Sequence, residues 1–198
     1  MKCVKQKPDL IKLLLLLLAT GLGLAACDNT YTPKPAGYVR IETPEKNYRL
    51  YDHQPQYSFE VPVYAEIMES PRAGESGWIN LVVPQINSTL HLSYKPVRGN
   101  LVEYITDSRT LAYKHTVKAD GIEETPFINP EERQYGMVYD LSGDVASAVQ
   151  FFITDSTTHF LRGSLYFSCP PYRDSLRPVI EFMREDIMHL IQSTRWKY

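Results

Sequence analysis

Hydrophobic and polar residues alternate in short runs from residue 38 onward. Proline, glycine or charged residues separate the first five runs, which are residues 38–41, 57–61, 63–67, 78–83 and 89–94. A period of two predicts β-strands with one buried face and one solvated face. Pro62 interrupts this series, so we expect a strand that is divided, bent or at a sheet edge there.

A second group of strands is expected after residue 120. Its last two runs are rich in Val, Ile, Phe and Tyr, which favours the middle of a sheet. Turn residues occupy 142–144 and 155–158. The predicted strands are residues 121–128, 134–141, 145–154 and 159–167.

Two other segments have helical periodicity. Asn100 is a candidate N-cap for a helix that runs to about Tyr113. The apolar residues of this helix fall roughly on one side and are Leu101, Ile105, Leu111 and Ala112.

The second helix lies near the C-terminal end and has the clearer pattern. Asp174 or Ser175 can cap it, and Pro178 fits its first turn, where the missing amide breaks no bond. Its solvent-exposed face should carry Glu181, Arg184, Glu185 and Gln192. Its apolar residues recur at helical spacing and are Leu176, Val179, Ile180, Met183, Ile187, Leu190 and Ile191.

The order of these elements is strands, helix, strands, helix, with short connections between strands. Short connections favour antiparallel pairing, and a sheet with one apolar face needs helices to cover it. We therefore predict a single α+β domain, built mainly on an antiparallel β-sheet with two packed helices.

The N-terminal residues have a different organisation. Residues 1–26 contain lysines, then a leucine run, then small residues, which is the layout of a secretory signal. Leu24-Ala25-Ala26-Cys27 matches the lipobox of bacterial lipoproteins, whose cysteine thiolate takes a diacylglyceryl group. An ordinary secreted protein with a chance cysteine is the alternative.

Cleavage before Cys27 divides the chain into three parts. They are a lipoprotein-type signal peptide at 1–26, the lipidated Cys27 with an extended tether at 27–37, and the globular domain at 38–198. We expect Cys27 to carry diacylglycerol and an N-acyl chain, and we expect no other cofactor. Two or three acyl chains hold a protein stably at a membrane.

The amino-acid composition argues against some classes of binding partner. The chain has 21 basic and 23 acidic residues, and the signal removes four of the lysines, so the remainder is acidic. Nucleic acid is therefore not an expected partner. No CxxC or HxxH spacing occurs, so no metal site is expected. Cys169 is either a buried residue or a thiol that pairs between chains.

Several sequence stretches identify a protein family more specifically than the hydrophobic patterns do. They are residues 31–35 and 37–38 after Cys27, the block DSRTLAYKHTVKAD at 107–120, residues 147–152 with 154–156, and residues 159–163. Together they resemble the family of gliding-motility lipoproteins GldD over nearly all of the chain beyond the signal. The order of strands and helices also looks like the sandwich of the PsbP and Mog1 proteins.

This resemblance implies a role in the bacterial cell envelope. Family members are membrane-attached, have no known enzymatic activity, and belong to the machinery that couples gliding to type IX secretion. The partners so implied are the membrane and other envelope proteins, with no small-molecule substrate. The domain is expected to face the periplasm, on either the inner or the outer membrane.

The block at 107–120 holds the candidate partner-binding residues Arg109, Tyr113, Lys114, His115 and Lys118. Its lysines bring positive charge to an acidic chain, and Arg109 and Tyr113 would share one face of a helix. One hypothesis is a docking site for an acidic partner segment or an anionic group. The alternative is that Arg109 pairs with Asp107 or a nearby Glu, and that the lysines are a solvated helix end.

Catalysis and sugar binding have weaker support. Five histidines accompany several Ser and Asp residues, but no GxSxG turn frames a serine. Fourteen tyrosines could instead stack on glycan rings, although tyrosine is also an ordinary sheet residue. A lipid-anchored glycan- or ligand-binding envelope module is therefore the second interpretation.

Overall fold

A computed structural model describes residues 43–69, 77–114, 119–168 and 173–198, with the backbone alone at 173–175. The predicted signal, the tether, Cys27 and the predicted strand at 38–41 lie outside these residues, and so does Cys169. The predicted boundaries at residues 26 and 37 therefore stay predictions.

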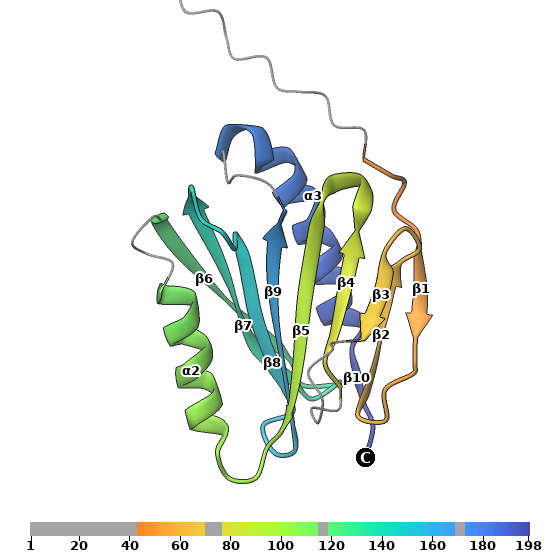
Figure 1. Cartoon of the computed structure of the whole chain (residues 1–198). Helices are drawn as coiled ribbons and strands as arrows, with labels where there is room; N and C mark the ends of the chain where they lie inside the picture. The colour runs from red at the N-terminus through yellow and green to blue at the C-terminus, as the bar shows by residue number, and fades with distance from the viewer. Residues whose placement is uncertain (1–42, 70–76, 115–118, 169–172) are drawn as a thin grey trace, which may run out of the picture. The chain divides into compact units, whose positions relative to one another are not determined.

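The alternating runs pair into a seven-stranded sheet in which every neighbour is antiparallel. Strand β9 lies in the middle and β8 beside it, as their apolar sequences predicted (Figure 1). The order is β3 (Glu66–Glu69), β4 (Ile79–Val83), β5 (Ser88–Pro96), β9 (His159–Phe167), β8 (Val149–Thr154), β7 (Gln134–Gly143) and β6 (Ala119–Asn129).

A smaller three-stranded sheet has the order β1 (Tyr48–Tyr51), β2 (Tyr57–Pro62) and β10 (Arg195–Trp196). The strand predicted at 63–67 is wrong in its first half, because β2 ends at Pro62 and β3 begins only at Glu66. The strand predicted at 145–154 likewise begins late, at Val149. A short 3-10 helix, η1 (Pro84–Ile86), joins β4 to β5.

Helix α3 (Arg173–Ser193) packs against β2 and β8 and closes the core. The predicted apolar face is confirmed, since Val179, Met183, Ile187, Leu190 and Ile191 are all buried. The predicted start is wrong. The helix begins at Arg173, so Asp174 and Ser175 are helical residues, not caps, and Pro178 lies inside it. Proline already has a helical φ, and one lost backbone bond is outweighed by this much burial.

The N-terminal part of the domain is attached to α3 by a buried carboxylate. Asp186 is 3% exposed and accepts hydrogen bonds from Lys46 Nζ at 2.9 Å, Tyr48 OH at 2.9 Å and Tyr64 OH at 2.6 Å. The Lys46 ammonium also lies 3.9 Å from the centre of the Phe182 ring. These contacts fix the first described segment of the domain to α3.

Helix α2 (Leu101–Tyr113) covers the opposite face of the large sheet, where it contacts β8 and β9 (Figure 1). Its predicted bounds are confirmed, but the Asn100 side chain does not cap it; instead, Asn100 Oδ1 accepts a hydrogen bond from the Arg98 amide at 2.9 Å. Ser108 and Ala112 are the buried residues of the helix. Leu111, expected on the buried side, is 39% exposed.

Candidate functional site

Helix α2 is tied to the edge strand β6 by one carboxylate. Glu124 Oε1 accepts hydrogen bonds from Tyr113 OH at 2.6 Å and from Arg109 Nε at 3.4 Å. The Arg109 guanidinium lies 5.0 Å from the centre of the Tyr113 ring, so the two side chains do share one helix face. The pKa of Arg109 is raised by its hydrogen bond with Tyr113 and by the negative charge of Glu124. Arg109 therefore pairs with a nearby glutamate. The sequence analysis had left this pairing open as the alternative to a docking role for Arg109.

The remaining candidate residues separate in space. Lys114 follows the last turn of α2, is exposed, and lies on the side of the helix that faces β5 and β9. His115 and Lys118 lie outside the described residues. The structure thus brings Arg109 and Tyr113 together at β6 and places Lys114 at a different edge of α2.

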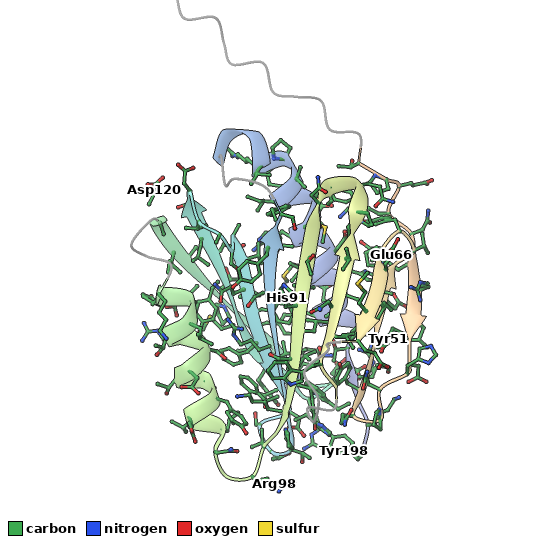
Figure 2. The ribbon with its side chains drawn as sticks, viewed as in Figure 1. Tyr51, Glu66, His91, Arg98, Asp120 and Tyr198 are labelled. Atoms are coloured by element: carbon green, nitrogen blue, oxygen red, sulfur yellow. The ribbon has the colours of Figure 1, made fainter. Side chains whose placement is uncertain are left out.

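Beside α2, the same face of the sheet is open. Cross-strand pairing aligns a row of side chains over this face, from β4 to β6. His91 belongs to this row and lies about midway along β5 (Figure 2). Its Nδ1 is 2.7 Å from Asn80 Oδ1, and burial lowers the pKa of its imidazole. The row consists of Asn80, His91, Ser164, Gln150, Tyr139 and Glu124.

Two adjoining cavities lie on this face. The first, about 280 Å³, is bounded by α2 on one side and by β5 and β9 on the other. The second, about 570 Å³, opens over β4, β5 and β9. They have four lining residues in common: Ser93, Lys95, Leu111 and Arg162. Leu111 is exposed because it points past the helix contact towards these cavities.

Arg162 is the charged residue at the centre of this surface, and sequence reasoning did not select it. The guanidinium is half-buried, and its Nη2 donates a hydrogen bond to Gln150 Oε1 at 2.7 Å. It makes no ion pair with any described residue, and burial lowers its pKa. The one signal in the sequence was a lone arginine within the otherwise uncharged run Phe160–Phe167 of a central strand.

A model of the family described as gliding motility lipoprotein GldD matches residues 28–196. The chain belongs to this family. A search of the curated proteins finds no match. Among solved structures, the chain is similar to the solution structure of cyanobacterial PsbP from Synechocystis sp. PCC 6803. The identity is 12%, the match covers 82% of this chain and 99% of that chain, and the TM-score is 0.45.

Membership of the GldD family indicates that the chain is a lipoprotein of the gliding apparatus and is associated with a membrane. None of the helices within the described ranges is long and apolar enough to cross a bilayer. Three of the stretches that suggested GldD meet around the open sheet face, because α2 contacts both β8 and β9. They contribute Lys114, Gln150 and Arg162 to it.

The described histidines of this GldD chain have structural partners. His159 is buried, lies 2.9 Å from Tyr94 OH through its Nδ1 and stacks on Trp196 at 5.2 Å. His189 Nε2 is 2.6 Å from a Glu60 carboxylate oxygen. These hydrogen-bond partners are a tyrosine and a glutamate, not a serine. Within the described residues, no group of three His, Cys, Asp or Glu side chains could hold a metal ion.

Proposed function

We propose that this GldD-family chain is a lipid-anchored, non-catalytic component of the gliding and type IX secretion machinery, and that it acts by binding other envelope proteins. The observation that carries the proposal is the family match over residues 28–196. The lipobox at Cys27 supplies the anchor, with diacylglycerol and an N-acyl chain as its only non-protein group. We place the domain in the periplasm.

Binding is assigned to the solvent-exposed side chains of α2. Val102 is 78% exposed, and Leu111 and Tyr113 are each 39% exposed, so the helix presents apolar side chains to solvent. Apolar side chains ringed by charge are common at protein interfaces. Lys114 adds positive charge at the end of the helix, and His115 and Lys118 extend it along the sequence. An acidic segment of a partner is the complementary surface.

A charge-reversal experiment tests this assignment. Lys114→Glu combined with Lys118→Glu should abolish recovery of envelope proteins in a pull-down of the full-length lipoprotein, and should slow gliding. Arg177→Glu is the matched control, because Arg177 lies on α3 and pairs with Glu181 on the far side of the domain. Unchanged recovery by a folded double variant would remove α2 as the docking site.

The second interpretation is a glycan- or ligand-binding envelope module. The cavities on the open sheet face favour it, because they combine polar groups with aromatic walls. A peptidoglycan pull-down with the full-length protein separates the two. Recovery of wall fragments without envelope proteins would favour the module.

A further inference from the structure

Arg162 carries a charge that the described part of the protein does not neutralise. Within the described residues, its guanidinium makes one hydrogen bond, to the uncharged amide of Gln150, while its backbone pairs with the neighbouring strands and accepts a bond from Ser93 Oγ at 3.4 Å. A guanidinium has five N–H donors, and a partly buried cation without an anion is costly. The side chain lines both cavities, so its remaining donors face a space that a ligand can enter.

The larger cavity has a net positive lining. Lys95 and Arg162 are its charged lining residues, and no carboxylate from the described chain lines it. The smaller cavity differs because Asp107 of α2 lines it. An anion is therefore favoured in the larger cavity, over β4, β5 and β9, and disfavoured beside Asp107.

A hydroxyl without a partner lies next to the guanidinium. Ser164 is 2% exposed and lines the larger cavity, and its Oγ has no hydrogen-bond partner. It follows Arg162 by two residues on β9, so both side chains point to the same face at about 7 Å spacing. Ser93 lies directly opposite Arg162 on β5. Buried polar groups normally have a partner, and a bound oxyanion would supply one here.

The walls of this cavity are apolar and partly aromatic. Trp78 and Tyr166 line it together with Leu111, which extends from α2. The indole of Trp78 is fixed by a hydrogen bond from its Nε1 to the Tyr94 carbonyl at 2.9 Å. A volume of about 570 Å³ is in the range of small-molecule sites, which combine apolar walls with a few polar groups.

We propose that this cavity binds a small molecule with a flat apolar body and an oxyanion, carboxylate or phosphate, with Arg162 and Ser164 as the oxyanion contacts. The ligand site borders the α2 docking surface at Leu111, but its oxyanion contacts lie on β9, and neither proposal depends on the other. Arg162 forms the charge-assisted bonds, because its planar fork matches both oxyanions.

Calorimetric titration of the full-length lipoprotein in a non-ionic detergent tests the site. The probes are benzoate, phenyl phosphate and, as an uncharged isostere, benzamide. We expect at least one of the two anions to bind, and benzamide to bind about tenfold more weakly or worse. Binding by one anion alone identifies the oxyanion that the site takes. Binding by neither anion, or equal binding by benzamide, would overturn the proposal.

Substitutions of single residues test which side chains contact the oxyanion. Arg162→Gln should weaken anion binding about tenfold or more, and Ser164→Ala about threefold or more. Arg162→Lys keeps the charge and should retain part of the affinity. Arg177→Gln removes an exposed arginine of α3, outside the cavity, and should leave affinity unchanged. If Arg162→Gln does not fold, Lys95→Gln combined with Ser164→Ala replaces it. Wild-type affinity in a folded Arg162→Gln or replacement variant contradicts the assignment.

Discussion

The turn between β8 and β9 depends on a single carboxylate. Asp155 Oδ1 accepts hydrogen bonds from the backbone amides of Thr157, Thr158 and His159, at 3.0, 2.8 and 2.8 Å. Burial opposes ionisation, but these bonds outweigh it and lower the pKa of Asp155 to about 2. The same side chain reaches the C-terminal end, where Tyr198 OH donates to Oδ2 at 3.2 Å.

Asp155→Asn should reduce the free energy of unfolding by about 1–3 kcal/mol at pH 6, since buried amide donors lose a charged acceptor. Because the folded-state pKa is lowered, the carboxylate stabilises the fold above about pH 4, and this contribution fades as pH falls towards 2. Urea unfolding at pH 6 and pH 2.5 should show the two proteins converging in acid. Asp52→Asn, at an exposed ion pair, is the control. A gap that stays constant with pH would contradict this account.

Gly163 permits the closest side-chain approach in the middle of the sheet. A Cβ at this position would lie 2.1 Å from Cε1 of the buried Phe151 ring. Gly163→Ala should therefore destabilise the protein by about 1–3 kcal/mol, because the ring must move within a packed core. At Gly121 a Cβ would meet only Ser142 Oγ, at 3.4 Å, so Gly121→Ala should change little. Thermal unfolding of both variants measures the difference, and equal melting temperatures would refute it.

Helix α2 is held against the sheet by few fully buried side chains. Only Ser108 and Ala112 are buried, while Leu101, Tyr104 and Ile105 pack against the core with part of their surface exposed. The bonds from Arg109 and Tyr113 to Glu124 add a second attachment, at β6. An exposed contact of this kind contributes little to global stability but holds the helix in place.

Glu124→Ala should therefore loosen α2 selectively. We expect faster amide exchange in Leu101–Tyr113 than in β9, while the global free energy of unfolding falls by less than about 1 kcal/mol. Glu123→Ala is the matched control, since neighbouring residues of a strand point to opposite faces. Hydrogen exchange read by mass spectrometry would decide, and unaltered exchange in α2 would show that the Glu124 contacts do not hold it.

Strand β9 and helix α2 keep their predicted bounds. The turn residues at 155–158 mark where β9 begins, and α2 keeps its bounds although its apolar pattern is weaker than that of α3. Strand β1 was missed because its burial pattern does not alternate, and β10 because it has two residues. The early start of α3 was missed because Pro178 was taken as a limit of its first turn.

The candidate site was less predictable than the fold. The approach of Arg109 and Tyr113 to Glu124 depends on how α2 lies against β6, which no local pattern encodes. Arg162 was missed because a charge in a central strand becomes informative only when its neighbours are known. The burial of Asp186 depends in the same way on Lys46, far away in the sequence.

The proposed function requires a folded domain that is held at a membrane by lipid. The structure describes the domain, and GldD membership fits a lipoprotein of the envelope. The contact of Lys46 with Asp186 joins the first described segment of that domain to its core.

The mass of the N-terminal peptide of the native protein, purified from membranes, tests this requirement most directly. The account predicts a peptide that begins at Cys27 and carries the mass of a diacylglyceryl group with an N-acyl chain. An unmodified thiol at Cys27, or a peptide that still contains residues before it, would contradict the account.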